Sequence, residues 1–185
     1  MTRAALYDTT GGPEVLYLAE VADAAPGDGK VSVRVHAAGL NPFDAKMRSG
    51  FIPSEAPFPR RIGGDFAGTV DAAGPGAVYF DGTPVAVGDE VLGRANGAVA
   101  ERVTAAASDL ARRPATLPVE VAGGLHVAGL TAVSVLATLP VGAGDTVLVG
   151  GAAGAVGFVA AQLAVHAGAR VIGTASARNH ELLRS

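Results

Sequence analysis

Cysteine is absent from the 185-residue sequence. Its absence excludes disulfide bonds, thiolate nucleophiles and any zinc site built from cysteine ligands. Long hydrophobic runs are missing too, because no stretch reaches the ~18 apolar residues of a membrane-spanning helix. The N-terminal segment MTRAALYDTT holds no apolar core of signal-peptide length. These absences predict a soluble, cytoplasmic protein.

An excess of charge of one sign is also lacking. The chain has 14 basic and 17 acidic residues, a net charge of −3, and its basic residues are scattered. No basic patch of the kind that binds nucleic acid or an anionic membrane is present, so we expect neither as a partner. Hydrophobic residues make up 49% and charged residues 17%, a balance typical of globular proteins that form a core.

Residues 2–118 carry the signals of short β-strands separated by tight turns. Apolar and polar residues alternate most clearly along Val31–Val35, as in a strand with one buried face. Turn sequences such as Gly74-Pro75-Gly76 separate the candidate strands. The pattern predicts an irregular, partly open β-barrel domain over residues 1–118, with strands at 3–7, 15–21, 30–37, 65–73, 90–93 and 98–104.

The periodicity changes after Pro118. Residues 119–139 lack proline and are rich in Ala, Val and Leu, which favours a helix, although glycines at 123, 124 and 129 weaken an unbroken one. A continuously apolar strand at 146–149 is typical of a parallel sheet covered on both faces. The order that follows predicts the first part of a Rossmann domain over residues 119–185: a glycine turn, a helix at 154–167, a strand at 170–174 and a helix from about 177. The fold class is therefore a β domain followed by an incomplete α/β domain.

A dinucleotide-binding fingerprint lies between the strand at 146–149 and the next helix, in the sequence VLVGGAAGAVG at 147–157. Gly154 would let the backbone approach a pyrophosphate, and Gly157 would let the helix pack closely on the strand. Free amides at the helix start would face the phosphates. Ala152 replaces the first glycine of the GxGxxG pattern. The strand–turn–helix–strand context favours this interpretation over the alternative, a glycine-rich turn that only packs a helix.

The type of cofactor is read at the end of the second strand, where an acidic residue would bind a ribose 2′-hydroxyl. Here the sequence is Gly173-Thr174-Ala175-Ser176-Ala177-Arg178, and no acidic residue occurs before Glu181. Small residues together with Arg178 leave room and charge for a 2′-phosphate, so NADPH is favoured over NADH. The alternative is that Arg178 is a solvated residue at the start of a helix.

At this point the chain resembles the quinone oxidoreductase branch of the medium-chain dehydrogenases, which also contains plant enone reductases. The similarity extends along essentially the whole chain, and its motifs are specific together although none is specific alone. They are Gly11-Gly12-Pro13-Glu14-Val15-Leu16, AGLNPFD at 38–44, Arg48-Ser49-Gly50, GDFAGTV at 64–70, VGDEV at 87–91, AGLTA at 128–132 and the glycine turn.

The resemblance implies a GroES-like barrel followed by a Rossmann domain, and hydride transfer from NADPH to a quinone or an α,β-unsaturated carbonyl compound. In zinc-containing relatives a cysteine stands at the position of Asn41 and a His-Glu pair at Gly64-Asp65. Asparagine is a poor zinc ligand and glycine is none, whereas catalytic zinc needs three protein ligands. We therefore expect a reaction without a metal.

Transferred by position, the resemblance places Asn41 at the nicotinamide and Thr131 at its carboxamide. Lys46 stands where many relatives have a tyrosine near the cofactor. A lysine can donate a proton as an ammonium ion, and plant enone reductases share it, which favours enones as substrates. The alternative is a surface lysine in a loop. The expected catalytic residues are Asn41 and Lys46, and the expected cofactor-binding residues are Asn41, Lys46, Thr131, Ala152, Ala153, Gly154, Ala155, Val156, Gly157, Ser176 and Arg178.

The sequence stops within its last expected helix and supplies two strands of a sheet that usually has six. We therefore expect the 185-residue chain alone to bind NADPH poorly and to be inactive. Either the sequence is a fragment of a longer gene, or a homodimer partner or a second chain completes the sheet. Two other functions remain open. One is a non-catalytic GroES-like binding or scaffold fragment, and the other is an enoyl reductase unit of a polyketide synthase.

Overall fold

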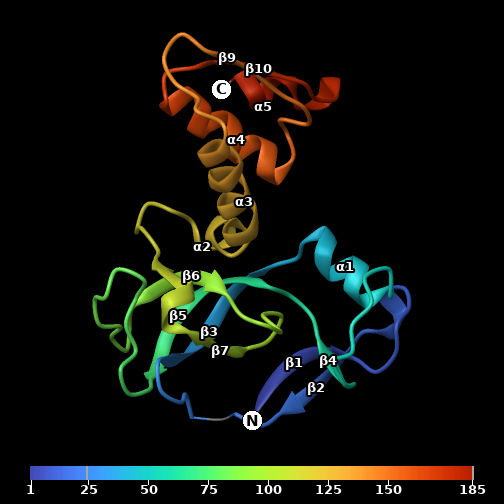
Figure 1. Ribbon diagram of the computed structural model, residues 1–185. Helices are drawn as coiled ribbons and strands as arrows, with labels where there is room; N and C mark the ends of the chain where they lie inside the picture. Colours follow the sequence, from blue (N-terminus) through green and yellow to red (C-terminus); the bar gives the residue numbers. More distant parts are fainter. Residues whose placement is uncertain (24, 185) are drawn as a thin grey trace. The chain divides into compact units, whose positions relative to one another are not determined.

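The computed structural model describes residues 1–23 and 25–184, and its contacts divide the chain into two compact units, Met1–His126 and Val127–Ser185 (Figure 1). The domain boundary predicted after residue 118 precedes this division by the short helix α2 (Val119–Ala122). No helix in the described part of the chain is both long and apolar enough to cross a membrane.

The first unit is built from two antiparallel sheets. The larger has five strands in the order β7-β3-β5-β6-β8, and the smaller has three in the order β2-β1-β4. Register shifts in the β3–β5 pair, between Ser32 and Val33 and between Val35 and Ala37, mark bulges that bend a strand and increase its twist. The strands are β1 (Thr2–Tyr7), β2 (Tyr17–Val21), β3 (Lys30–Gly39), β4 (Arg60–Arg61), β5 (Asp65–Ala73), β6 (Glu90–Arg94), β7 (Arg102–Ala106) and β8 (Leu110–Arg112).

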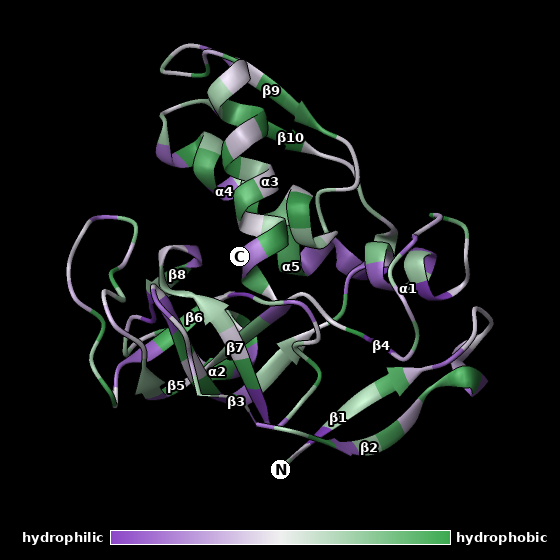
Figure 2. Cartoon of the chain, turned by 60° about the horizontal axis from the view of Figure 1, so that its bottom comes forward, coloured by the Kyte–Doolittle hydropathy of each residue, from purple (hydrophilic) through white to green (hydrophobic). Residues whose placement is uncertain are grey.

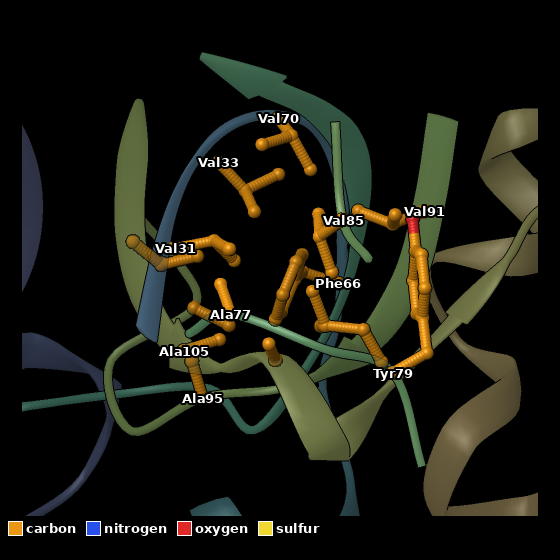
Figure 3. Packing of buried hydrophobic residues seen from close by; sticks show 14 residues of the cluster. Val31, Val33, Phe66, Val70, Ala77, Tyr79, Val85, Val91, Ala95 and Ala105 are labelled. Carbon is orange, nitrogen blue, oxygen red and sulfur yellow. The ribbon is translucent and has the colours of Figure 1, made fainter. Parts of the chain in front are cut away.

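A continuous apolar core packs on the larger sheet. Val31 and Val33 alternate inward along β3, and they meet Phe66, Val70 and Val91 from the neighbouring strands. Figure 3 shows these side chains pointing toward one another. The strand alternation read from the sequence is thus the alternation that builds this core.

Two of the predicted strands of the first unit differ from the observed ones. The residues at 13–15 form a 3-10 helix, η1 (Pro13–Val15), so β2 starts only at Tyr17. Residues 98–101 are turn-like, with one isolated bridge from Ala4 to Ala100, and β7 begins at Arg102. The sequence-based prediction also omitted helix α1 (Pro42–Arg48), the 3-10 helix η2 (Ala107–Asp109) and the short strands β4 and β8.

The helix predicted over 119–139 is two helices, α2 and α3 (Leu125–Thr138). The break falls at Gly123-Gly124, where the backbone lies against β3. A Cβ at Gly123 would be 2.7 Å from the Cβ of Ala37, and a Cβ at Gly39 would be 2.7 Å from the carbonyl oxygen of Gly123. Two facing glycines thus allow a close approach that any side chain would prevent.

The second unit contains the predicted strand–helix–strand crossover. Strand β9 (Thr146–Val149) and strand β10 (Arg170–Gly173) pair in parallel, with Thr146 opposite Arg170 and Val149 opposite Gly173. Helix α4 (Ala155–His166) connects them. The 3-10 helix η3 (Ala177–Asn179) and helix α5 (His180–Arg184) follow β10.

The side chains that this unit buries are small. Among its described residues, the buried hydrophobic ones are all alanines: Ala128, Ala132, Ala152, Ala164 and Ala169. Larger apolar side chains stay in contact with solvent, and Leu148 in β9 is 69% exposed. Figure 2 shows this hydrophobic character along β9 and α3.

Candidate functional site: a glycine turn and helix α1

The glycine turn between β9 and α4 is closed by hydrogen bonds to the residue after β10. The N–H of Ala152 donates to the carbonyl oxygen of Thr174 at 2.9 Å, and the N–H of Gly151 donates to its hydroxyl at 3.2 Å. Thr174 donates its own N–H to the carbonyl oxygen of Val149 at 2.9 Å. Gly151 has a φ of +66°, in the left-handed region that favours glycine. The turn is therefore held in one shape by the strand pair beside it.

Helix α4 begins without a side-chain cap. Its N-cap is Gly154, and the first N–H groups of an α-helix have no carbonyl acceptor within the helix. A Ser, Thr, Asp or Asn at the N-cap would satisfy one of these donors, whereas glycine leaves them to a ligand or to water. The amides of Ala155 and Val156 lie here, at the positive end of the helix dipole. This arrangement suits a diphosphate.

Gly157 keeps the first turn of α4 tight against the glycine turn. A Cβ added to Gly157 would lie 2.5 Å from the carbonyl oxygen of Gly151 and 3.0 Å from the Cα of Ala152. Ala152 is 1% exposed, and a Cβ at Gly173 would come within 2.8 Å of its methyl group. Because the N–H of Ala152 is already bonded and its side chain is buried, Ala152 contributes to the site through the shape of the turn.

Ser176 and Arg178 follow directly after the turn's partner strand. The carbonyl oxygen of Ser176 accepts the N–H of Asn179 at 2.9 Å and so starts η3. Arg178 is exposed, and it forms no ion pair with any residue the structure describes. An unpaired guanidinium beside a nucleotide turn fits a 2′-phosphate.

Thr131 is an exposed residue of helix α3. Its hydroxyl donates to the carbonyl oxygen of Val127 at 2.6 Å. The hydroxyl proton is thereby used, and the oxygen retains lone pairs that can accept from an amide N–H. That acceptor is what binding to a carboxamide requires.

Asn41 and Lys46 lie on one short helix, α1, in the first unit. Asn41 is its N-cap: the N–H of Asn41 donates to the carboxylate of Asp44 at 2.7 Å, and the N–H of Asp44 donates back to the carbonyl oxygen of Asn41 at 3.0 Å. Lys46 is exposed, with its Nζ 5.7 Å from the ring centroid of Phe51, a cation–π contact. The remaining predicted site residues all belong to the second unit.

The end of α1 is tied to the loop before η1. The guanidinium of Arg48 donates to the carbonyl oxygen of Gly11 at 2.6 Å, and the N–H of Gly11 donates to the carbonyl oxygen of Arg48 at 3.1 Å. Arg48 is buried, although it is charged. Next to it, Gly50 has a φ of +80° and lies against Thr10. These contacts fix the orientation of the helix that carries Asn41 and Lys46.

Two residues of these sites were not predicted from the sequence. Thr174, the last residue of the strand predicted at 170–174, closes the glycine turn from just beyond β10. Phe51 provides the ring under Lys46, and no local pattern indicated that contact.

The described residues contain no group of three or more His, Cys, Asp or Glu side chains that could hold a metal ion. At the position where zinc-containing relatives would place a ligand pair, Gly64 has no side chain and Asp65 is fully buried at the start of β5.

Residues 27–137, more than half of the chain, match the alcohol dehydrogenase GroES-like domain. The chain belongs to this family. Within it, the chain is similar to quinone oxidoreductases of the medium-chain type. It is 36% identical to human quinone oxidoreductase over 169 residues, which cover 89% of this chain and 50% of that protein. The fold expected from the sequence, a GroES-like domain followed by part of a Rossmann domain, is confirmed.

Two further similarities bear on the cofactor and on the range of relatives. A mycobacterial protein solved in complex with NADPH is 39% identical and superposes with a TM-score of 0.85, over 100% of this chain and 55% of that one. The pikromycin polyketide synthase component PikAII of Streptomyces venezuelae is 39% identical over 160 residues, which cover 86% of this chain and 4% of that protein. The chain thus spans about half the length of the quinone oxidoreductase that it matches.

Proposed function

We propose that the protein carrying this chain is an NADPH-dependent oxidoreductase that reduces a quinone or an α,β-unsaturated carbonyl compound without zinc. The observation that carries the proposal is the uncapped start of α4 after a glycine turn, within a parallel β9–α4–β10 crossover. The family membership and the NADPH complex of a similar protein support the choice of a nicotinamide dinucleotide.

The cofactor's diphosphate would be held by the amides of Ala153, Ala155 and Val156, with Gly157 keeping the helix close. The N–H of Gly154 donates to the carbonyl oxygen of Gly151 at 2.9 Å, so Gly154 would contribute the close approach of its backbone. Ser176 and Arg178 would hold the 2′-phosphate, because no acidic side chain lies between Thr174 and Arg178 to repel it. Asn41 and Thr131 would bind at the nicotinamide end. When bound, NADPH supplies a hydride to the β-carbon of an enone or to a quinone.

Lys46 is the proposed proton donor. Hydride addition to an enone moves an electron pair onto the carbonyl oxygen, and an ammonium group stabilises that negative charge and can give it a proton. The cation–π contact with Phe51 restricts the long side chain, so less rotamer entropy is lost when Lys46 meets the substrate. Because charge on a single oxygen is stabilised in this way, no metal is needed as a Lewis acid.

The cofactor assignment can be tested with the charge at position 178. We expect Arg178→Glu to weaken NADPH binding at least about tenfold, because one charge-assisted contact is lost and a repulsive charge is gained. NADH binding should change little. Arg170→Glu, an exposed arginine on β10, is the matched control. Fluorescence titration of both cofactors measures the effect, and equal losses for NADPH and NADH would contradict the role of Arg178.

The role of Lys46 predicts a change in the catalytic constant. Lys46→Met should lower kcat for an enone about 10- to 1,000-fold, the usual range for loss of a proton donor or one electrostatic contact. Lys46→Arg keeps the charge and should recover part of the rate. NADPH affinity, measured by titration, separates a chemical effect from a binding effect. An unchanged kcat in Lys46→Met would leave Lys46 as a surface residue.

The similarity to PikAII supports a second candidate function. In it, the chain belongs to an enoyl reductase unit that acts on acyl chains bound to a carrier domain. Such a unit would reduce an enoyl thioester faster than a quinone of similar size. A non-catalytic binding fragment would instead leave the amides of residues 153–157 unprotected from hydrogen exchange when NADPH is added. Comparing the two substrates and measuring that protection separates the three functions.

A further inference from the structure

A cavity of about 630 Å³ lies in the first unit beside α1, and its charged lining is almost all of one sign. Three arginines line it, Arg60, Arg61 and Arg94, against one carboxylate, Asp44. The carboxylate already accepts the N–H of Asn41 at 2.7 Å. The lining of the cavity therefore carries a net positive charge.

The cavity arginines differ from other arginines of the same unit. Arg3, Arg102 and Arg113 form ion pairs with carboxylates. Among the residues that the structure describes, neither Arg61 nor Arg94 forms such a pair. An anion in the cavity would give these two guanidinium groups the charged partner that they lack among the described residues.

The guanidinium group of Arg60 is held in position, and the stem of Arg61 is packed. Arg60 donates to the carbonyl oxygens of Ser54 and Ala56 and stacks on Phe58, with its Cζ 4.2 Å from the ring centroid. The stem of Arg61 lies on Gly97, where an added Cβ would come within 2.5 Å of the arginine Cδ. An arginine held in this way loses little side-chain entropy on binding an oxyanion.

Helix α1 also contributes to the lining of the cavity. Phe43, Asp44 and Met47 of α1 line it, and the same helix carries Asn41 and Lys46. A substrate whose reacting carbonyl group meets Lys46 can therefore extend a tail along α1 toward the arginines. Apolar contact with Phe43 and Met47 suits a short carbon chain between the two ends.

We propose that this cavity binds an oxyanion at one end of the substrate, a carboxylate or a phosphate, and so selects enones with an anionic tail. The selection by charge rests on the proposed function, whereas binding of the anion to the cavity does not. Arg60 and Arg61, which form strand β4, both line this cavity.

The binding test uses saturated probes that cannot react and needs no cofactor. Protein containing residues 1–185 is titrated with 4-oxopentanoate, with (3-oxobutyl)phosphonate and with methyl 4-oxopentanoate, and amide shifts are followed by NMR. We expect the anionic probes to shift the amides of Gly63, Gly64 and Asn96, and the ester to bind at least about tenfold more weakly. A preference between the two anionic probes identifies the oxyanion. Equal binding of ester and acid would overturn the proposal.

Substitutions locate the contact. Arg61→Met and Arg94→Met should each weaken the anionic probe about 10- to 100-fold and leave the ester unchanged. Arg61→Lys, which keeps the charge, should recover part of the affinity. Arg34→Met is the control, since Arg34 is exposed on β3 and does not line the cavity. Shifts that persist at full strength in the Arg61→Met, Arg94→Met double variant would place the anion elsewhere.

A kinetic arm separates this inference from the proposed function. If the protein reduces enones, kcat/KM for 4-oxopent-2-enoate should exceed that for its methyl ester, and the two arginine variants should abolish the difference. A protein that binds the anionic probe at the cavity but reduces no enone would retain the anion site and refute the proposed reductase. Equal kcat/KM values for the acid and its methyl ester would refute the selection by charge and would leave the proposed reductase in place.

Discussion

The two units of this chain differ in the side chains that they bury and in their ion pairs. The first buries a cluster of valines with Phe66, Tyr79 and Leu110, and all five ion pairs found among the described residues belong to it. Among the described residues of the second, the fully buried hydrophobic side chains are all alanines, and the larger apolar ones are half-buried or exposed. Because hydrophobic stabilisation follows buried apolar area, the first unit supplies most of the folding free energy. The second presents backbone groups for a ligand.

The sharpest way to test this contrast is to truncate one large side chain in each unit. Phe66→Ala should lower the free energy of unfolding by about 3–5 kcal/mol, because Phe66 is fully buried in the core. Leu148→Ala in β9 should cost well under 1 kcal/mol, because the leucine side chain is 69% exposed. Chemical denaturation of both variants measures the difference. Similar losses would mean that the second unit packs as tightly as the first.

A smaller effect is expected where the second unit is tightly packed despite its small side chains. Gly157→Ala should destabilise the unit by about 1–3 kcal/mol, since the new methyl group would lie 2.5 Å from the carbonyl oxygen of Gly151. NADPH affinity should fall with it. Gly142→Ala, where an added Cβ meets nothing within 4 Å, is the matched control. Faster hydrogen exchange along α4 in the first variant alone is the expected result, and equal exchange in both would refute close packing at the turn.

The smallest effect concerns acid. Burial raises the pKa of Asp71, but hydrogen bonds from Ser32 and Arg102 outweigh it and hold the pKa below its ordinary value of 3.8. The lowered native pKa means that this group stabilises the fold above the ordinary value and that the contribution is lost as pH falls through the lowered one. Because the pair is half-exposed, we expect a loss of a few tenths of a kcal/mol. Urea denaturation at a series of pH values should show a flatter acid response in Asp71→Asn, and an unaltered response would exclude this carboxylate.

The sequence predicted the fold best where one local pattern coincided with one structural element. Alternation along Val31–Val35 identified β3, and the apolar run before the glycine turn identified β9. Helix α1 was missed although Asn41, Pro42 and Asp44 supply a cap, a favoured first residue and an acidic first turn. Its seven residues are too few to show a helical period.

The rest depended on contacts between distant parts of the chain. The break at Gly123 exists because Ala37 of β3 approaches it, and the sequence separates these residues widely. Likewise, Arg60 and Arg61 carry no local sign of a cavity; strand β1, helix α1 and the residues after β6 surround them only in the folded unit. The sequence pattern predicted the glycine turn itself. It did not predict the hydrogen bond from the N–H of Ala152 to the carbonyl oxygen of Thr174, because that bond depends on the pairing of β9 with β10.

The reciprocal hydrogen bonds between Gly11 and Arg48 couple the loop before η1 to the end of helix α1. Residues on that loop touch no reacting atom, yet a shift in its backbone would be transmitted as a tilt of the short helix that bears Asn41 and Lys46. Substitutions near Thr10 can therefore change the substrate preference although every side chain that lines the pocket stays the same.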